Sequence, residues 1–465
     1  MGHVQRLLRS LNPVPTLASV RLISRASNAV SVPLDLEEDL ESSQAKHRHH
    51  PGVRKHSRVS LPPKLFEAAK TVLERRDVKQ LREAAVVLRE QLWSRQLPVE
   101  DRELRQKATH LERELLGNKV DAMSQEERAY LEDSVKEAVF HKLRHQTYRW
   151  KALNYDEFGS YTYLVGRLAA DYAVLHSIFN EIKILDKTFV PETLMDFGSG
   201  IGTAYWAAAD AWPQKVKEYF AVDTSADMNE LAKLLVQGGN IDGRVKREAY
   251  FQRQFLPASD KLKFDLVVSA FSLMELPSAQ RRLETVANLW AKTSNALVLV
   301  ENGTLAGHRV VSEARDFVLT MENSGDAGGE TCGKRALVLA PCPHDKECPK
   351  NLESKKVPCT FVVGFEDSVF NYKNSNGRTL YSYVVLQKFP SVPGERSWPR
   401  IVEPVMCRSR HVICRLCCSD GNLKEIVLSK RRNGRHAYRI ARCSNWGDQL
   451  PLELLDQDAC SHATD

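Results

Sequence analysis

Cysteine is missing from the first 331 residues of this 465-residue chain, and all ten cysteines lie from Cys332 onward. Thiol chemistry of any kind is therefore confined to the last third of the chain. The chain also lacks any apolar run approaching the roughly 20 residues that cross a bilayer, which predicts no membrane-spanning helix and no membrane partner. Its length allows two or three domains that each bury a core.

Acidic residues are missing from the N-terminus, where the first Asp or Glu is Asp35. The same stretch carries Arg6, Arg9, Arg21 and Arg25 among several serines. This basic, Ser-rich composition is typical of a mitochondrial transit peptide, which we expect over residues 1–34; a disordered basic tail is the alternative. A transit peptide predicts a protein of the mitochondrial matrix, a reducing compartment where structural disulfides are uncommon.

Basic residues cluster near both ends, although the net charge is only +7. Residues 46–58, KHRHHPGVRKHSR, hold five Lys or Arg and no acid. Residues 423–442, LKEIVLSKRRNGRHAYRIAR, hold seven against the single Glu425. Two such stretches in a matrix protein favour binding of a polyanion, and RNA is the expected one. A solvated charged surface is the alternative for each stretch.

Apolar periodicity divides the chain into a helical part and an α/β part. Helical spacing starts at Leu65, and strand-like runs follow Glu192 in ETLMDFGSG, KEYFAVDTS, KFDLVVSAF and NALVLVENG. Strands that alternate with helical segments predict a parallel sheet covered on both faces. We therefore expect a transit peptide (1–34), a basic disordered arm (35–64), a helical N-terminal domain (65–150), an α/β domain (151–390) with a cysteine-rich insertion (332–359), a basic β-rich C-terminal extension (391–448) and a tail (449–465).

A glycine turn follows the first of these strands, in DFGSGIGTAYW. Asp196, Gly198, Gly200 and Gly202 stand between strand and helix, where the backbone turns sharply and a ligand approaches the main chain. Asp223 ends the next strand, where an acid can accept hydrogen bonds from a ribose. The acid before the first glycine resembles class I (Rossmann-like) methyltransferases, which implies S-adenosylmethionine rather than a dinucleotide. A degenerate pocket kept only for folding is the alternative.

No catalytic residue can be named beside this turn. Amino-methylating enzymes of the class place Asn or Asp and two prolines after the fourth strand, and here that turn is Ser269-Ala270-Phe271-Ser272. Methylation of a cytosine carbon needs a nucleophilic cysteine in the same region, which has none. The sequence therefore predicts lost or very weak methyl transfer.

Three cysteines share the stretch APCPHDKECPKNLESKKVPC. Five residues separate Cys342 from Cys348 and ten separate Cys348 from Cys359, whereas two to four residues usually separate paired zinc ligands. Flanking prolines stiffen the loop, and Cys-Pro steps recur in ferredoxin loops. An iron–sulfur cluster with a fourth cysteine from further along is favoured. Zinc, with His344 as a possible ligand, and unligated thiols remain the alternatives.

Several segments together resemble the mitochondrial small ribosomal subunit-associated methyltransferase-like family. They are LVLVENGTLAGHRVVSEAR, APCPHDKECP, LYSYVVLQK, LCCSDGNLKEIVLSKRR and NWGD, and the likeness spans Tyr148 to Asp448. The chain departs from the family in the helical segment GRLAADY, which lacks the proline that the family has there. The resemblance implies adenosylmethionine binding and a 4Fe–4S cluster on four cysteines, which would be Cys342, Cys348, Cys359 and Cys417, the last chosen over Cys418.

The same resemblance implies a role in assembling the small mitochondrial ribosomal subunit. The expected partners are its rRNA and ribosomal proteins, and we expect a monomer off the ribosome. The alternative from a different class is an active mitochondrial rRNA (cytosine) methyltransferase.

Overall fold

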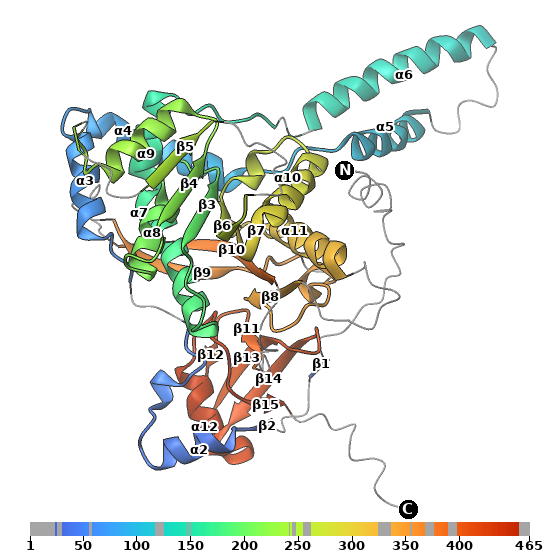
Figure 1. The fold of residues 1–465 in the computed structure, drawn as a ribbon. Coiled ribbons are helices and arrows are strands. Elements are labelled where there is room, and N and C mark those ends of the chain that lie inside the picture. The colour runs from blue at the N-terminus through green and yellow to red at the C-terminus, as the bar shows by residue number, and fades with distance from the viewer. Residues whose placement is uncertain are drawn as a thin grey trace, which may run out of the picture.

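The computed structural model describes residues 24–25, 30–54, 58–116, 125–146, 148, 150–240, 242–243, 248–253, 262–323, 336–353, 356–367, 376–388 and 398–454. These residues form two lobes, one above the other in Figure 1. We call the part built on the eight-stranded sheet the large lobe, and the part built on the five-stranded sheet the small lobe. Most of the predicted transit peptide lies outside the described residues, as do Cys332 and Cys460.

The strands of the large lobe are β3 (Thr193–Phe197), β4 (Glu218–Val222), β5 (Glu248–Gln252), β6 (Phe264–Ala270), β7 (Thr293–Asn302), β8 (Ala336–Ala340), β9 (Phe361–Glu366) and β10 (Asn376–Lys388). Its helices are α3 (Pro63–Leu73), α4 (Val78–Ser94), α5 (Asp101–Leu116), α6 (Gln125–Gln146), α7 (Glu157–Leu185), α8 (Thr203–Ala211), α9 (Ala226–Val236), α10 (Ala279–Lys292) and α11 (Leu305–Asn323), with 3-10 turns η3 (Leu273–Glu275) and η4 (Pro349–Asn351).

The small lobe contains β1 (Ser24–Arg25), β2 (Val30–Ser31), β11 (Arg400–Ile401), β12 (Met406–Cys407), β13 (His411–Cys417), β14 (Leu423–Ser429), β15 (Glu453–Leu454), α2 (Leu34–Glu41), α12 (Lys430–Cys443) and the 3-10 turn η1 (His47–His49).

The large sheet runs in the order β5-β4-β3-β6-β7-β10-β8, with β9 also paired to β10. Strands β3 to β7 are mutually parallel, whereas β10 is antiparallel to both of its neighbours. Central residues such as Val267 and Val298 are fully buried because helices cover both faces. The predicted α/β sheet and its four predicted strands are confirmed. The strand order reverses between β3 and β6, and ligands of open α/β sheets bind at the carboxyl ends of strands beside such a reversal.

Helix α7 connects the N-terminal helices to the sheet. Its N-cap is Asp156, whose side chain accepts a hydrogen bond from the Gly159 backbone nitrogen at 2.8 Å. The helix is apolar around most of its circumference, because α4 and α8 pack on one side of it and β9 and β10 on another. Its N-terminal part, with Tyr163, lies at the carboxyl end of the sheet, and its C-terminal part, with Glu181, lies at the junction of the two lobes.

The region predicted to be a separate helical domain (65–150) divides into two parts. Helices α3 and α4 pack on α9 and α7, and their Leu65 and Leu81 belong to the same buried cluster as the sheet. Helices α5 and α6 pack on each other and project from the large lobe (Figure 1). Helical spacing of leucines predicts an apolar face, but it does not identify the surface that the face covers.

Residues 35–64, for which the sequence predicts a disordered arm, are ordered where the structure describes them. Leu36 and Leu40 of α2 are buried against Ile440 of α12, in the hydrophobic core of the small lobe. His50 is 2% exposed and lies 2.9 Å from the Ser444 hydroxyl. The arm differs from the prediction because its apolar partners lie about four hundred residues further along the chain.

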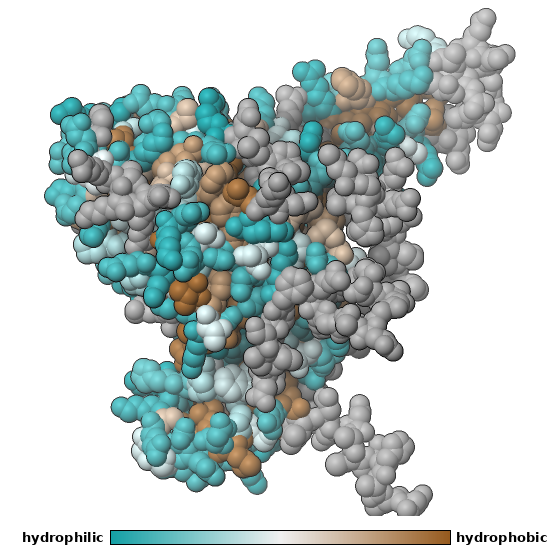
Figure 2. Space-filling view, in the orientation of Figure 1, coloured by the Kyte–Doolittle hydropathy of each residue, from teal (hydrophilic) through white to brown (hydrophobic). Residues whose placement is uncertain are grey.

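The predicted tail (449–465) also contributes to the small lobe where it is described. Leu450 and Leu452 are buried in its core, and β15 pairs with β2. The visible surface of this lobe is mainly hydrophilic (Figure 2). No helix among the described residues is both long and apolar enough to cross a membrane.

Candidate cofactor cavity, cysteine site and basic face

A cavity of about 240 Å³ opens at the carboxyl ends of β3, β4 and β6, beside the reversal of strand order. Gly198, Gly200 and Asp223, three of the five predicted cofactor residues, line it. The other lining residues include Leu153, Tyr155, Tyr163, Phe197, Val222, Thr224, Met228, Arg253, Phe271, Ser272 and Glu275. The cavity is thus formed by the turns that follow three parallel strands.

The glycine turn fits a ligand that approaches its backbone. Gly198 and Gly200 have φ angles of 69° and 50°, in the left-handed region that favours glycine. A Cβ on Gly198 would meet the Ser272 Cβ at 2.3 Å, so this glycine lets two turns approach closely. A Cβ on Gly200 would meet no protein atom within 4 Å, so it would point into open space that a ligand can fill.

Asp223 is held by backbone amides and keeps free acceptor sites. Its two carboxylate oxygens accept hydrogen bonds from the Gly200 nitrogen at 2.9 Å and the Ser225 nitrogen at 2.8 Å. Burial raises the pKa of Asp223, although these two hydrogen bonds oppose the shift. An ionised carboxylate has about four acceptor sites, so the side chain can still accept hydrogen bonds from a hydroxyl pair.

Asp196 and Gly202 lie behind the cavity wall. Asp196 is 3% exposed and accepts a hydrogen bond from the Tyr219 hydroxyl at 2.9 Å. Burial raises the pKa of Asp196 to about 7. Gly202 is the N-cap of α8 with φ 78°, and a Cβ there would lie 3.6 Å from the Ala232 Cβ. Both residues support the turn instead of lining the cavity.

The turn after β6 contains no acid or amide positioned over the cavity. The Ser269 and Ser272 hydroxyls lie 2.7 Å apart, and Ser272 donates to the Phe197 carbonyl at 3.1 Å. Phe271 has a positive φ of 58° and lies under the Arg167 guanidinium, 4.8 Å from the ring centroid. Glu275, a cavity carboxylate nearby, is engaged by Arg95 at 2.8 Å.

The four predicted cluster cysteines come together from both lobes. Cys342, Cys348 and Cys359 belong to the loop between β8 and β9 of the large lobe, and Cys417 ends β13 of the small lobe. Burial raises the pKa of the Cys417 thiol, and the nearby charges of the other three raise it further. The alternative, Cys418, is packed in the hydrophobic core of the small lobe. The predicted insertion (332–359) also supplies β8, a strand of the large sheet.

Two polar side chains, those of Arg315 and His344, lie close to these cysteines. The Arg315 guanidinium of α11 donates to the carbonyls of His344 and Lys346 at 2.9 and 2.7 Å, which fixes the cysteine loop. Burial raises the pKa of Cys342, and the Arg315 charge opposes that shift. The His344 Nε2 lies 3.3 Å from the Cys417 sulfur, and burial lowers the pKa of His344 to about 4. Within the described residues, no group of three or more His, Cys, Asp or Glu side chains is arranged to hold a metal ion.

Comparison with known proteins was made at both sequence and structure level. A family model described as "Mitochondrial small ribosomal subunit Rsm22" matches residues 157–451, more than half of the chain. The chain belongs to the Rsm22 family. This confirms the family that the sequence resemblance predicted.

Named relatives of this Rsm22-family chain include "Ribosome assembly protein METTL17, mitochondrial" of Homo sapiens, which is 42% identical over 406 residues, or 87% of this chain and 86% of that protein. "Ribosome assembly protein RSM22, mitochondrial" of Saccharomyces cerevisiae is 22% identical, over 58% of this chain and 64% of that protein. The solved magnesium protoporphyrin IX methyltransferase of Synechocystis, with bound SAM, is 15% identical with a TM-score of 0.29, over 58% of this chain and 100% of that one. The fold assignment rests on the strand order and not on this distant likeness.

The Rsm22-family chain gathers its two predicted basic stretches on one face. Turn η1 of the first stretch packs against α12 of the second, and the His47 and His436 rings stack with centroids 5.3 Å apart. The sequence predicts basic strands here, but most of the cations lie on a helix. The exposed cations of α12 are Lys430, Arg431, Arg432, Arg435, Arg439 and Arg442.

Sequence reasoning missed the aromatic wall of the cofactor cavity in this Rsm22-family protein. It assigned the aromatic stretch 148–163 mainly to core packing, whereas Tyr155 and Tyr163 line the cavity and pack edge to face at 5.6 Å. The Tyr163 hydroxyl donates to Asp171 at 2.7 Å. The density of tyrosines before the first strand was the available signal, because a tyrosine can line a pocket with an apolar ring and a polar tip.

Proposed function

We propose that this chain is an assembly factor of the small mitochondrial ribosomal subunit, acting in the matrix. It binds S-adenosylmethionine, carries a 4Fe–4S cluster and contacts rRNA, with little or no methyl transfer. Relatives named as mitochondrial ribosome assembly proteins support the assembly role. The observation that carries the rest is the electrostatic interaction of Cys417 of the small lobe with three cysteines of the large lobe, because a group bound there would fix the basic small lobe to the lobe that contains the cofactor cavity.

The cysteine site fits a cluster better than a single ion. A cubane attaches its four thiolates to four different iron atoms, so the sulfurs need not converge on one point. Four thiols from two lobes that interact electrostatically would supply such a set of ligands. The residues that would hold the cluster are Cys342, Cys348, Cys359 and Cys417. Zinc, with His344 beside Cys417, is the alternative.

The cavity fits adenosylmethionine through its open glycine and its acid. When bound, this cofactor supplies a methyl group on a sulfonium centre. Gly200 would admit the cofactor to the backbone, and Asp223 would hold its ribose hydroxyls. The turn after β6 offers two hydroxyls already bonded to each other or to the backbone, and Glu275 is engaged by Arg95. This supports a binding role with little or no catalysis.

A matched pair of glycine variants tests the cofactor proposal. Gly200 and Gly238 both have positive φ and open space at the Cβ position, but only Gly200 lines the cavity. Asn tolerates this backbone region, so both variants should fold. We expect Gly200→Asn to weaken adenosylmethionine binding at least about tenfold by calorimetry, the ~1.4 kcal/mol of one lost close contact, and Gly238→Asn to leave it unchanged. Equal affinities in the two variants would contradict the assignment.

The intact cavity also keeps an active rRNA (cytosine) methyltransferase as the second candidate. Cells that carry Gly200→Asn separate the two functions. If the subunit assembles normally while a methyl mark on its rRNA disappears, the enzyme is the correct function. If all marks persist while assembly fails, the cofactor serves assembly.

The basic face of α12 should provide the non-specific part of rRNA affinity. Each lost phosphate contact lowers the slope of log K against log salt by about 0.7–0.9. We therefore expect Arg431→Gln/Arg435→Gln to bind small-subunit rRNA roughly tenfold or more weakly at about 0.1 M salt, measured by filter binding. The control is Lys70→Gln/Arg75→Gln, which removes the same charge from two exposed positions, one on α3 and one in the turn that follows it. An equal loss in the control would mean that only net charge matters.

A further inference from the structure

A second cavity, of about 410 Å³, lies where the two lobes and the basic arm meet. Arg54 and Arg58 reach it from the arm, Arg378 from β10 of the large lobe, and Arg400 from β11 of the small lobe. Glu181 of α7 is the acid among the described residues that line it, so four guanidinium groups face one carboxylate. Its volume lies within the range of small-molecule sites.

Two of the four arginines have charges that the protein leaves available. Glu181 is occupied by Arg400 and lies 3.9 Å from Arg54. Arg58 and Arg378 are both exposed, and neither is paired with an acid within the part of the chain that the structure describes. The guanidinium fork suits phosphate oxygens, which it can bind in a bidentate manner.

The backbone holds Arg58 and Arg378 beside the same glycine. Val59 bonds to the edge of β9 through its nitrogen to the Gly364 carbonyl at 2.9 Å. Arg378 is the register partner of Gly364 across the β9–β10 ladder, and the Arg58 Cγ lies 4.0 Å from where a Gly364 Cβ would be. Because Gly364 has no side chain, there is room between Arg58 and Arg378.

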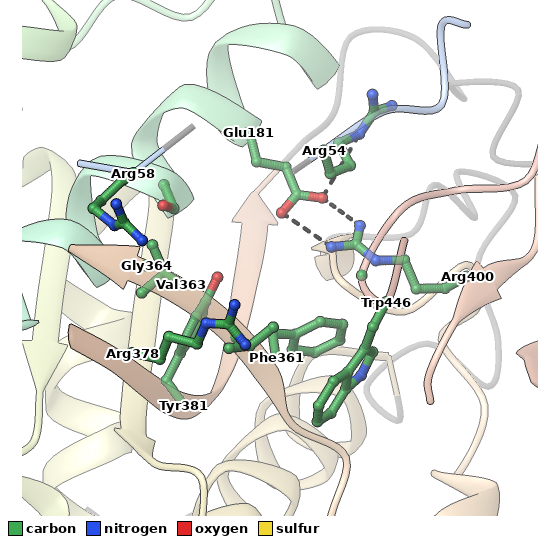
Figure 3. A pocket seen from close by; sticks show the side chains of 13 residues that line it. Arg54, Arg58, Glu181, Phe361, Val363, Gly364, Arg378, Tyr381, Arg400 and Trp446 are labelled. Atoms are coloured by element: carbon green, nitrogen blue, oxygen red, sulfur yellow. Dashed lines mark hydrogen bonds and ion pairs between the residues drawn. The ribbon is translucent and has the colours of Figure 1, made fainter. Parts of the chain in front are cut away.

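Aromatic rings line another part of the same cavity. Figure 3 shows Trp446 and Phe361 beside Arg378 and below the ion pair of Glu181 with Arg400. A Cβ on Gly447 would lie 3.3 Å from the Phe361 ring, so the Trp446 loop approaches that ring closely. The indole nitrogen of Trp446 is buried and has no hydrogen-bond partner among the described residues.

We propose that this cavity binds one unpaired nucleotide of an RNA chain, with its phosphate at Arg58 and Arg378 and its base against the Trp446 ring. Guanidinium groups beside aromatic faces are how proteins hold unpaired bases and their phosphates. RNA is favoured over a free nucleotide because Arg58 ends the basic stretch 46–58, whose η1 turn packs on α12. This inference rests on the proposed rRNA binding and adds a site that distinguishes unpaired from paired RNA.

The test compares full-length variants on two probes by fluorescence anisotropy: a single-stranded oligouridylate and an RNA duplex of the same length. We expect Arg58→Gln/Arg378→Gln to weaken single-strand binding roughly tenfold or more at about 0.1 M salt and to reduce its salt slope by about 1.4, because each single-strand contact contributes about 0.7. Duplex affinity should stay within twofold. Both side chains are exposed, so the variant should fold.

Three comparisons make the result decisive. Arg431→Gln/Arg435→Gln should weaken both probes, and Lys70→Gln/Arg75→Gln should weaken neither. Trp446→Leu should weaken the single strand alone, by fivefold or more, since stacking of one base contributes about 1–3 kcal/mol. Three outcomes would overturn the nucleotide site while leaving rRNA binding intact. The first two are an equal loss of affinity for both probes in Arg58→Gln/Arg378→Gln, and no loss for either probe. The third is that uridine monophosphate binds the protein but does not compete with either RNA. If the unmodified protein binds neither probe, the result contradicts both the proposed rRNA contact and this nucleotide site.

Discussion

Cys342→Ser is expected to yield a colourless protein that no longer associates with the small ribosomal subunit. Burial raises the pKa of the Cys342 thiol and of the Cys348 thiol, to about 11 for the latter. Buried thiols of this kind are neutral unless a metal replaces their protons. Removing one ligand should therefore release the whole group and free the small lobe. The measurements are iron, sulfide and the visible spectrum after anaerobic purification, with subunit association followed on sucrose gradients.

The adjacent cysteines provide a matched control for this prediction. Cys417→Ser should reproduce the loss, because the Cys417 thiol interacts electrostatically with the other three thiols and lies 3.3 Å from the His344 Nε2. Cys418→Ser should keep the colour and the association, because that side chain is packed in the small-lobe core. Zinc without sulfide in the unmodified protein would exclude the cluster. Association that survives loss of the metal would show that the cysteines do not hold the lobes together for ribosome binding.

The parallel half of the sheet could be predicted from the sequence because its signals are local. Apolar runs mark β6 and β7, which are buried on both faces, and the short apolar segment of β3 is followed directly by the glycine turn. Gly198, Gly200 and Asp223 then follow from the order of strand, turn and acid. Local patterns of this kind require no knowledge of which distant segments meet.

Contacts between distant segments could not be predicted in the same way. Leu36 and Leu40 of α2 are spaced as in any short helix, and only the fold shows that they cover Ile440. Tyr155 reaches the cofactor cavity because α7 begins above the sheet's carboxyl edge, which the helix sequence alone does not specify. The composition of the acid-poor stretch 46–58 is typical of a disordered segment. It does not indicate that two of its residues, His50 and Arg54, are bound to the small lobe.

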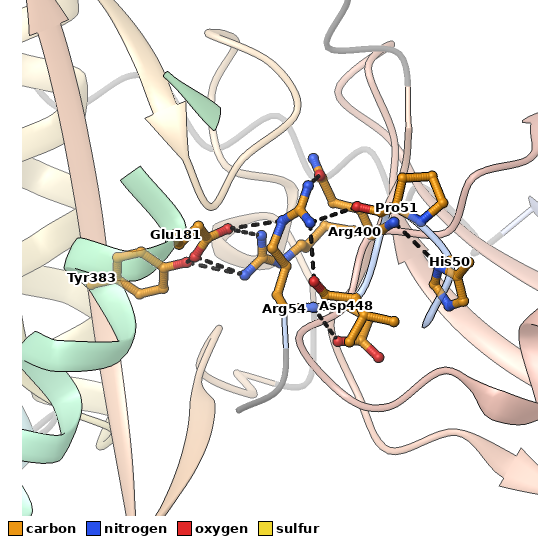
Figure 4. Close-up of polar contacts among 10 residues, drawn as sticks. His50, Pro51, Arg54, Glu181, Tyr383, Arg400 and Asp448 are labelled. Atoms are coloured by element: carbon orange, nitrogen blue, oxygen red, sulfur yellow. Dashed lines mark hydrogen bonds and ion pairs between the residues drawn. The ribbon is translucent and has the colours of Figure 1, made fainter. Parts of the chain in front are cut away.

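A buried ion-pair network across the lobes depends on the same long-range contacts (Figure 4). Glu181 of α7 is bound by Arg400 from the small lobe and by the Tyr383 hydroxyl from β10. Arg400 also donates to Tyr383 at 3.0 Å. Burial alone would raise the pKa of Glu181, but the Arg400 charge and these hydrogen bonds hold it below its usual value. The network therefore stabilises the junction only while the carboxylate is ionised.

Arg400→Met should be the most destabilising single change at this junction. It removes the cation that binds Glu181 directly and leaves this carboxylate, whose side chain is 6% exposed, with the Tyr383 hydroxyl and with Arg54 at 3.9 Å. The loss should therefore approach the cost of breaking a buried ion pair, about 3–5 kcal/mol. Urea midpoints at neutral pH should fall accordingly. The control Arg415→Met removes a partly exposed pair with Glu403 and Glu425, and should cost less than about 1 kcal/mol.

The pH dependence of unfolding tests whether the stability loss in Arg400→Met comes from the Glu181 charge, whatever the size of that loss. In the unmodified protein the lowered pKa of Glu181 contributes stability above the unfolded value, about 4.3 for Glu, and that contribution is lost as pH falls through the lower folded value. In Arg400→Met, only the Tyr383 hydrogen bond and the Arg54 charge still oppose burial. The Glu181 pKa is then higher than in the unmodified protein, so ionisation of Glu181 stabilises the variant less as pH rises. The gap between the two proteins should therefore shrink as pH falls toward 4, and Glu181→Gln/Arg400→Met should recover most of the loss at neutral pH. A gap that stays constant with pH would show that Arg400 acts through packing alone.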